Sequence, residues 1–286
     1  MKPQHLSEDI HKQLAHVTAH AGVNLARFPD FLLIGPPRTG TTWVHHHLSR
    51  HPGIFMPKEK EMYYFSTLGK PTQKHFRFSS LEEYLAALDD TVAMRLRKIA
   101  GCAWRSRRFY SPVVRGEATA SYASLPGEVI REICLINPDI KAIMLLRNPI
   151  ERTWSHAKKD IMPHVDRSTG VVPEAELDKF FRASGQLENA RYAGLIRNWE
   201  EFLKPGHLLV DAFSRIADAP EDLLAGIQRF LGVSEGTRYV DRGALRERIN
   251  RTNDDPIPPA MQERLTARLS VAVEEYEALL RTRVAR

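Results

Sequence analysis

The sequence predicts an α/β fold, in which a central parallel β-sheet is flanked by α-helices within a single domain. The same local order occurs twice. The apolar run at residues 31–34 is followed by a glycine-containing turn and a helix start at Thr41. The apolar run at residues 141–146 is likewise followed by a helix start at Asn148. Such alternation of strand and helix is typical of a parallel sheet, because each return of the chain needs a crossover.

Capping residues and apolar periodicity predict the other elements. A Ser7 cap and apolar residues at helical spacing predict an N-terminal helical arm within residues 1–30. Ser80 begins a capping box followed by an apolar helical stripe. Further helices are expected over residues 126–137, 187–202 and 220–231, a strand over 207–211, and a C-terminal helix within 260–286. All are placed in one domain, residues 1–286, since α/β chains of this length often form one.

Composition narrows the class of ligand. The net charge of +6 points to an anionic ligand or partner, although nucleic acid would fit that charge as well as a small anion. The two cysteines, Cys102 and Cys134, lack the spacing of a disulfide framework or a metal site. No run approaches the ~18–20 apolar residues of a membrane span. The first 30 residues contain no apolar signal-peptide segment, so we expect a cytoplasmic protein.

The turn at residues 35–40 has the form of a phosphate cradle. Glycines let the backbone approach a phosphate closely, and a helix N-terminus adds N–H groups and a partial positive charge. Gly35 and Gly40 match the spacing of the ATP/GTP loop, but Thr41 stands where that loop has its lysine, and the cation is Arg38. This substitution argues against an ordinary nucleotide triphosphatase. A generic strand–turn–helix corner is the alternative.

The loop sequence Pro-Pro-Arg-Thr-Gly-Thr-Thr-Trp at residues 36–43 resembles the 5′-phosphosulfate loop of sulfotransferases that use 3′-phosphoadenosine 5′-phosphosulfate (PAPS). The resemblance is to the bacterial and heparan-sulfate-type members and implies a P-loop-type fold. That family usually has lysine where Arg38 stands, and arginine keeps the charge but cannot give up a proton. The resemblance assigns the donor's phosphosulfate end to Pro37, Arg38, Thr39, Gly40, Thr41 and Thr42, and contact with its adenine to Trp43. Core packing is the alternative for Trp43.

A second stretch, Leu-Leu-Arg-Asn-Pro-Ile-Glu-Arg-Thr-Trp-Ser, resembles the 3′-phosphate motif of the same family. An arginine at a strand end and a serine about two helical turns later can converge on one anion. The resemblance therefore implies that Arg147 and Ser155 bind the phosphate on the ribose. Relatives often complete this site with a late basic loop, which here suggests Arg242 and Arg248. Because both motifs occur in the family's order, chance agreement becomes improbable.

The resemblance also suggests the acceptor side of the site. Relatives place a glutamate before an aromatic-rich stretch as general base, and Glu61 before Met-Tyr-Tyr-Phe fits that pattern. A hydroxyl is a poor nucleophile until its proton is accepted in the transition state, so the chemistry needs such a group. Glu59 and Glu117 are the fallback candidates for the base. We assign Lys60 to the substrate, with the sulfate group as the alternative, and Glu117 to a substrate hydroxyl, with a contact to Arg38 or an inert loop position as the alternatives. Arg38 and Glu61 are assigned as catalytic residues.

These motifs predict transfer of a sulfuryl group from PAPS to a hydroxyl or amine, without a metal. The acceptor is expected to be a small molecule or natural product, a glycan, a lipid or a carrier-bound group. One alternative is an ATP-dependent small-molecule or nucleotide kinase, in which Asp211 would act as a metal-binding aspartate after a strand. The other is a non-catalytic protein that binds an anionic polymer through a degenerate loop. A homodimer is possible on this sequence.

Residues 91–116 form a basic segment without any acidic residue. Aromatic residues interleave with the cations, a pattern that suits single-stranded nucleic acid, an anionic glycan or an acidic carrier protein. A solvated charged face is the alternative. No nucleic-acid fold signature accompanies the segment, so nucleic acid is not expected.

Overall fold

The computed structural model describes residues 2–89, 91–106, 109–161, 174–235, 245, 249 and 256–284. A five-stranded sheet lies at its centre, and all of its strand pairs are parallel. The strand order is β2-β3-β1-β4-β5, so the first strand is central. The strands are β1 (Phe31–Gly35), β2 (Ile54–Phe55), β3 (Val114–Ala118), β4 (Lys141–Leu146) and β5 (Leu208–Ala212). This architecture confirms the predicted fold class.

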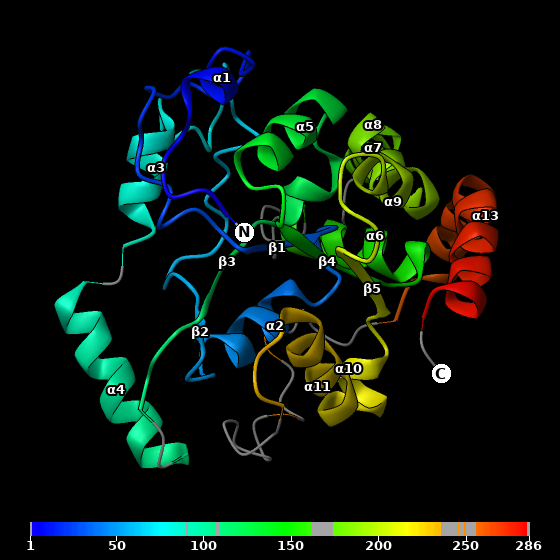
Figure 1. The fold of residues 1–286 in the computed structure, drawn as a ribbon. Helices are drawn as coiled ribbons and strands as arrows, with labels where there is room; N and C mark the ends of the chain where they lie inside the picture. The colour runs from blue at the N-terminus through cyan, green and yellow to red at the C-terminus, as the bar shows by residue number, and fades with distance from the viewer. Residues whose placement is uncertain are drawn as a thin grey trace, which may run out of the picture.

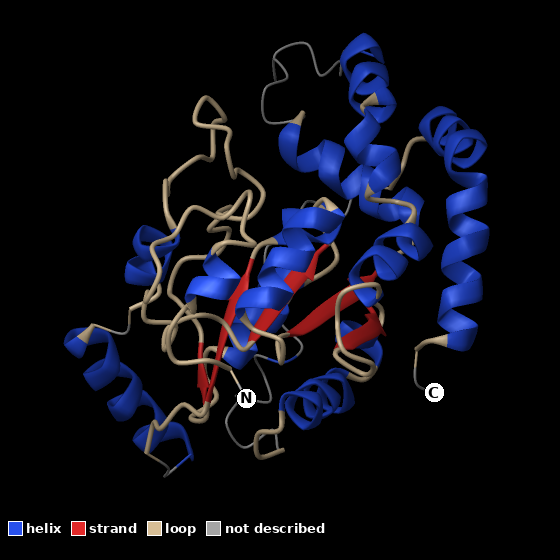
Figure 2. Ribbon diagram, turned by 45° about the horizontal axis from the view of Figure 1, so that its top comes forward, coloured by secondary structure: helices blue, strands red, loops and turns tan. Residues whose placement is uncertain are grey.

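Helices cover both faces of the sheet (Figures 1 and 2). The helices of the first half are α1 (Glu8–His11), α2 (Thr41–Leu48), α3 (Leu81–Ala87), α4 (Val92–Ser106), the 3₁₀ helix η1 (Ala120–Ser124) and α5 (Gly127–Ile136). Those of the second half are α6 (Pro149–Asp160), α7 (Glu174–Arg182), α8 (Ser184–Glu188), α9 (Tyr192–Glu200), α10 (Arg215–Asp218), α11 (Pro220–Leu231) and α13 (Pro259–Thr282). No helix of the described part of the chain is long and apolar enough to span a bilayer.

Alternating strand residues build two cores on opposite faces of the sheet, because successive side chains of a strand point to opposite sides. Leu32 and Ile34 pack with α5, α9 and the aromatic residues that precede α3. Phe31 and Leu33 pack with α2 and α11 instead. A third apolar cluster joins α6, α7 and α13 beyond the edge of the sheet. The strands are buried on both faces, which explains their continuous apolar sequence.

Local sequence signals place most helix ends as expected. The side chain of Asn148 accepts the N–H groups of Ile150 and Glu151 at the start of α6, with Pro149 in the first turn. Ser80 caps α3 in the same way. Gly232 ends α11 in the left-handed conformation that favours glycine.

The predicted N-terminal helical arm is wrong, because only the four residues of α1 are helical within residues 2–30. The carboxylate of Glu132, a residue of α5, accepts the backbone N–H groups of Ala15, His16 and Val17. These bonds hold the arm in an irregular path across the sheet's helical layer. Leu6, Val17, Leu25 and Phe28 then enter the core. Tertiary hydrogen bonds have replaced the helical ones that the local sequence favoured.

The parallel register brings three loops to one edge of the sheet. Leu33 of β1 pairs with Ala118 of β3 on one side and with Ile143 of β4 on the other. The carboxyl ends of these strands therefore lie side by side. Ligands of open α/β sheets bind outside such carboxyl ends, where the strand order changes direction. The residues that follow β1, β3 and β4 are thus the candidates for the functional site.

Candidate active site

The loop after β1 has the tight backbone of an anion-binding turn. Gly40 is the N-cap of α2 with φ +89°, and a Cβ added there would lie 2.4 Å from Ile216 Cδ1. At Gly35, with φ +96°, a Cβ would lie 2.3 Å from the carbonyl oxygen of Ala120. The positive φ favours glycine at both positions, and at Gly35 the nearby backbone of Ala120 also leaves no space for a Cβ. The Thr39 hydroxyl donates to the carbonyl oxygen of Pro36 (2.7 Å), which closes the turn from within.

The two motifs of the sequence meet in space. Nε of Arg38, in the first loop, donates to Oγ of Ser155 on α6 at 3.0 Å. Nη1 of Arg147, at the end of β4, donates to the carbonyl oxygen of Arg38 at 3.3 Å. Segments more than a hundred residues apart therefore form one cluster.

Two cations lie close together in this cluster. Burial lowers the pKa of Arg38, and the neighbouring positive charge of Arg147 lowers it further. The guanidinium of Arg147 stacks over the ring of Phe213 at 4.5 Å, and the Tyr192 hydroxyl donates to the carbonyl oxygen of Arg147 (2.6 Å). Holding like charges together in a partly buried place costs free energy that a bound anion would offset. The electrostatics of the cluster therefore fit a phosphate or sulfate group.

Lys60 supplies a second cation to the first loop, which has Thr41 in place of the lysine of the ATP/GTP loop. Its Nζ donates to the hydroxyls of Thr41 (3.2 Å) and Thr42 (2.9 Å) in the first turn of α2. The sequence assigned Lys60 to the acceptor, whereas these contacts place it against the phosphate-binding turn. The same ammonium lies 3.7 Å from the Glu61 carboxylate. Burial lowers the pKa of Lys60, while Glu61 acts in the opposite direction.

Glu61 stands beside this lysine in a constrained conformation. Its backbone is left-handed, with φ +60°, a region that non-glycine residues seldom adopt. The N–H of Glu61 donates to Ala118 O, and its side chain accepts the N–H of Ala120 at 3.1 Å. The side chain keeps 28% of its surface exposed. Such strain in an accessible carboxylate is a feature that clusters at functional sites.

The two fallback acids are placed differently. Glu59 is directed away from the loops to an exposed ion pair with Arg77 (3.0 Å). Glu117 is fully buried and hydrogen-bonded to Thr119 and, at 3.5 Å, to the Tyr84 hydroxyl. The assignment of Glu117 to the substrate is therefore wrong, because no part of its side chain reaches solvent. Burial raises the pKa of Glu117 to about 7.

Thr119 is a residue that sequence reasoning missed. Its hydroxyl donates to Glu117 and accepts the N–H of Met62 at 2.9 Å. It thereby links the buried acid to the backbone next to Glu61. Its place in the Gly-Glu-Ala-Thr sequence, two residues after Glu117, was the available signal. Glu117 and Thr119 therefore support the strained backbone at Glu61 rather than bind a ligand.

Trp43 packs in the core, as the alternative interpretation held. The indole is buried beside His47, and its Nε1 donates to the carbonyl oxygen of Leu245 at 3.2 Å. The ring is therefore covered by protein, and the structure gives no support to adenine contact. The two basic residues assigned to the late loop, Arg242 and Arg248, lie outside the described residues.

Asp211, the candidate metal-binding aspartate of the kinase alternative, is engaged by groups of the protein itself. Asp211 uses its carboxylate to bind Arg215 (2.8 Å) and the N–H of Ala212 (2.7 Å). Over the described ranges, no group of three or more His, Cys, Asp or Glu side chains could hold a metal ion.

Within the histidine run of α2, burial lowers the pKa of His45 to about 4 and that of His47 to about 3. Both rings are therefore neutral at pH 7.

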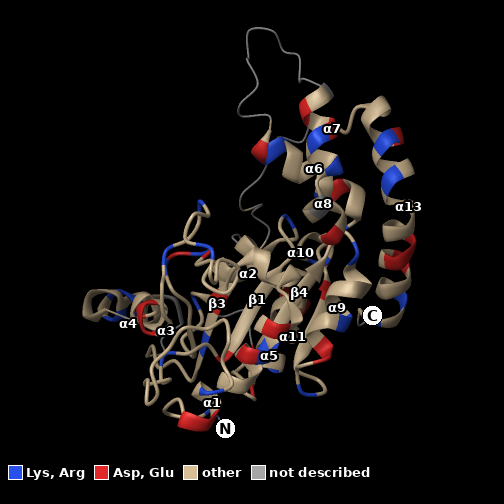
Figure 3. Cartoon of the chain, turned by 90° about the horizontal axis from the view of Figure 1, so that it is seen from above, with Lys and Arg blue, Asp and Glu red and all other residues tan. Residues whose placement is uncertain are grey.

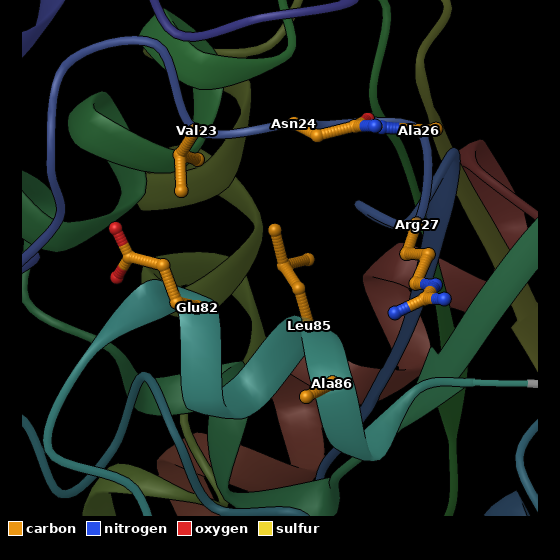
Figure 4. A pocket seen from close by; sticks show the side chains of 7 residues that line it. All are labelled: Val23, Asn24, Ala26, Arg27, Glu82, Leu85 and Ala86. Atoms are coloured by element: carbon orange, nitrogen blue, oxygen red, sulfur yellow. The ribbon is translucent and has the colours of Figure 1, made fainter.

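A separate hollow of about 430 Å³ lies between residues 23–27 and helix α3 (Figure 4). Arg27 and Glu82 lie at its rim, and Leu85 points into it from α3. It shares no lining residue with the loops that follow β1, β3 and β4. The hollow is thus distinct from the arginine–serine cluster.

The fold and the joined loops define an α/β protein with a phosphate-binding loop after its first strand and a second anion-binding position after its fourth. A model of the sulfotransferase family matches residues 29–236. The chain belongs to the sulfotransferase family. That match spans the sheet, both motifs and the segment that carries Lys60 and Glu61.

Individual proteins show the same relationship. The chain is 25% identical to the human bifunctional heparan sulfate N-deacetylase/N-sulfotransferase 2 over 229 residues, which are 75% of this chain and 23% of that protein. It is 27% identical to the membrane-associated sulfotransferase kil1 of Dictyostelium discoideum over 127 residues, 44% of this chain and 22% of that protein. The chain thus spans about a quarter or less of the length of these curated relatives.

A solved structure supports the fold. The crystal structure of a sulfotransferase from Alicyclobacillus acidocaldarius is similar with a TM-score of 0.59 and 21% identity, covering 88% of this chain and 96% of that one. The comparisons do not support the kinase or the non-catalytic polymer-binding alternative.

Proposed function

We propose that this protein transfers a sulfuryl group from PAPS to a hydroxyl or amine of an acceptor. The observation that carries the proposal is the cluster in which Arg38 bonds Ser155 and Arg147 bonds the backbone of Arg38. A donor with anionic groups at both the 5′ and the 3′ positions needs two cationic positions at a fixed separation. The Arg38–Arg147–Ser155 cluster would provide one of them, and the turn at Thr41 and Thr42 that Lys60 contacts would provide the other.

The first loop would hold the phosphosulfate end of the donor. The segment from Pro37 to Thr42 leads into α2, whose leading N–H groups have no intrahelical partner and favour an anion. The hydroxyls of Thr41 and Thr42 add side-chain donors at the same place. No acidic residue stands in the first turn of α2 to oppose a bound anion. Bound there, PAPS supplies an activated sulfuryl group whose departure leaves negative charge on the bridging oxygen.

Two cations would share the charge of the donor. Arg38 points to Ser155 and so serves the side where Arg147 and Ser155 select the 3′-phosphate. Lys60 bonds the loop hydroxyls next to Glu61 and so lies on the side of the reacting group. We assign to Lys60 the stabilisation of developing charge that the sequence assigned to Arg38. Preorganised charges in a partly buried site are effective because they need no reorganisation during the reaction.

Glu61 would accept the proton of the acceptor. Among the three candidate acids, Glu59 is engaged with Arg77 and Glu117 is sealed in the core. Glu61 combines exposure with a position beside Lys60. Burial and the neighbouring Glu61 raise the pKa of Tyr63 to about 12, so its phenol stays protonated next to that carboxylate. These contacts support Glu61 as the base, with the carboxylate aimed by the N–H of Ala120.

The acceptor is proposed from the chemistry of the base and from one matched relative. A carboxylate base suits a hydroxyl or an amine, and one matched relative is named for N-sulfation of heparan sulfate. We therefore propose a glycan or another hydroxyl- or amine-bearing molecule, free or carrier-bound, as the acceptor.

Calorimetric titration tests the donor site. The protein should bind 3′,5′-ADP without added metal and bind 5′-AMP more weakly, because only the former presents a 3′-phosphate. In Arg147→Ala the preference should fall about 10- to 100-fold, the range of a lost charge-assisted hydrogen bond of ~1.5–3 kcal/mol. Arg283→Ala, which breaks an exposed ion pair between the end of α13 and Glu200 on α9, is the matched control. An unchanged preference in Arg147→Ala would refute the assignment.

Transfer of labelled sulfate tests the base. Glu61→Gln should retain 3′,5′-ADP affinity and lose turnover by about 10²- to 10⁴-fold, the usual contribution of a general base. Glu59→Gln removes a neighbouring carboxylate that lies in an exposed ion pair and should leave turnover unchanged. Equal turnover in Glu61→Gln and the parent protein would exclude Glu61 from this role.

A further inference from the structure

Helix α4 presents an apolar face to solvent. Leu96 is 61% and Trp104 is 90% exposed. Val92 is also exposed, and at 100° per residue these three side chains fall within about one third of the helix circumference. The positions between them on that face are the exposed residues Ala93, Ala100 and Ala103. The outward face of α4, defined by these six residues, is thus continuous and contains no polar side chain.

The opposite face attaches the helix to the protein. Lys98 donates from Nζ to the carbonyl oxygen of Met56 at 3.1 Å, and its ammonium lies 4.3 Å from the centre of the Phe55 ring. Cys102 is buried, with Sγ 3.9 Å from Arg50 O. These contacts fix the rotation of the helix about its axis. The outward face is therefore held toward solvent, at the periphery of the molecule (Figures 1 and 2).

Exposed apolar side chains gather here. Six large hydrophobic residues of the described chain are exposed, and five of them lie between residues 92 and 113. The five are Val92, Leu96, Trp104, Phe109 and Val113, whereas the sixth, Val271, stands on α13. Single exposed apolar residues are ordinary, but a group of them in one segment marks an interaction surface.

The charge around this face has one sign. Residues 91–116 contain seven lysines and arginines and no acidic residue, and the ribbon of α4 carries no red in Figure 3. Arg97 borders the outward face on the side of Trp104, and Arg95 lies about 60° beyond Val92 on the other side, past Ile99. A partner that fits must offer negative charge at its surface and apolar material beneath it.

We propose that the outward face of α4 docks onto an anionic lipid bilayer, with the helix lying in the plane of the interface. An apolar face containing tryptophan, bordered by arginines, is the pattern of interfacial helices. A second copy of this chain would bring two basic segments together, which like-charge repulsion opposes. A nucleic-acid strand would need aromatic faces for stacking, whereas alanine, valine and leucine make up most of this face.

Vesicle binding by the full chain tests the proposal. The protein should sediment with vesicles of phosphatidylcholine and phosphatidylglycerol and not with phosphatidylcholine alone. Trp104 reports the contact, because the other three tryptophans, Trp43, Trp154 and Trp199, are buried. Its emission should shift to the blue and become protected from acrylamide on the anionic vesicles only. Trp104→Phe should abolish that spectral change while sedimentation persists.

Two variants with the same change of charge test whether vesicle binding depends on the outward face of α4. Leu96→Glu should weaken partitioning to anionic vesicles about tenfold or more, because a carboxylate must then enter the interface. Val271→Glu makes the same change on α13, where an exposed residue is distant in sequence from this face, and should bind as the parent protein does. Retained 3′,5′-ADP affinity would show that both variants are folded.

Four results would overturn the proposal. One is failure to bind anionic vesicles, and another is equal loss of binding in Leu96→Glu and Val271→Glu. A third is self-association in sedimentation equilibrium that Leu96→Glu abolishes, since a second copy would then cover the face. The fourth is unchanged vesicle binding by Leu96→Glu together with retention on heparin, which would reduce the surface to a site for anionic polymers.

Discussion

Glu117→Gln is expected to change how the stability of the protein depends on pH. Glu117 is fully buried among Thr119, Tyr84 and Tyr122, and burial raises its pKa from the ordinary 4.5 to about 7. The pKa values of Tyr84 and Tyr122 are raised well above 10, also by burial, so both phenols stay protonated throughout this range. Glu117 is therefore the member of this buried group that titrates between pH 4.5 and 7.

The sign and size of this effect of pH on stability follow from the difference in proton binding between the folded and the unfolded protein. Between pH 4.5 and 7 the unfolded chain loses this proton while the folded protein keeps it, so the stabilisation present at low pH is lost as the pH rises. At ~1.4 kcal/mol for each pH unit, the interval from 4.5 to about 7 corresponds to roughly 3 kcal/mol. That is a large fraction of the ~5–15 kcal/mol that stabilises a typical domain.

Glutamine has nearly the same shape and does not ionise. Its carbonyl oxygen can accept the Thr119 hydroxyl, but it loses one acceptor of the carboxyl group, so the variant should be less stable than the parent at pH 5 by about 1–2 kcal/mol. Between pH 5 and pH 8 the parent should lose about 2.5 kcal/mol of stability relative to the variant, so the order of the two stabilities should reverse by pH 8.

Urea unfolding of both proteins at pH 5, 6, 7 and 8 measures this change. Glu59→Gln, which alters an exposed carboxylate paired with Arg77, should differ from the parent by no more than about 1 kcal/mol at every pH. A constant difference between Glu117→Gln and the parent across the four pH values would refute the reasoning. It would mean that Glu117 is ionised in the folded protein throughout.

Two further predictions concern the phosphate-binding loop. Lys60→Met should lower the rate of labelled sulfate transfer by about 10²- to 10³-fold, because it removes the ammonium that bonds Thr42 and faces Glu61. Lys58→Met, at an exposed position two residues earlier, should retain the rate, and an equal loss in both variants would contradict the assignment. Gly40→Ala should lower the free energy of unfolding in urea by about 2 kcal/mol or more, since φ is +89° and the new Cβ would meet Ile216 at 2.4 Å. Parent-like stability of Gly40→Ala would show that the turn can relax.

Local sequence determined the parts of this protein whose physics is local. The apolar run of β4 was placed at its observed bounds, and so was α11 with Gly232 after it. Both follow from short-range rules, namely a buried strand's continuous apolar pattern and a helix's need for a left-handed residue at its end. The loop after β1 and the position of Ser155 relative to Arg147 also follow from spacing along a strand and a helix.

Tertiary structure decided which side chains work together. The sequence could not show that Glu132 would bind the backbone of residues 15–17 and prevent a helical arm, because the two segments are more than a hundred residues apart. It ranked Glu61 ahead of Glu117 as the base by resemblance, but it could not show that Glu117 is sealed from solvent. Their difference is burial, which arises only when β3 pairs with β1 and Tyr84 covers the strand end.

The division is clearest for the cations of the site. The local sequence determined that positive charge would gather at the carboxyl ends of β1 and β4, because Arg147 immediately follows β4 and Arg38 lies in the short loop after β1. Which anionic group each cation faces depends on side-chain direction across loops that share no local sequence. Arg38 donates a hydrogen bond to Ser155, whereas Lys60, from a different segment, donates hydrogen bonds to the hydroxyls of Thr41 and Thr42. Only the packed sheet edge brings these atoms within hydrogen-bonding distance.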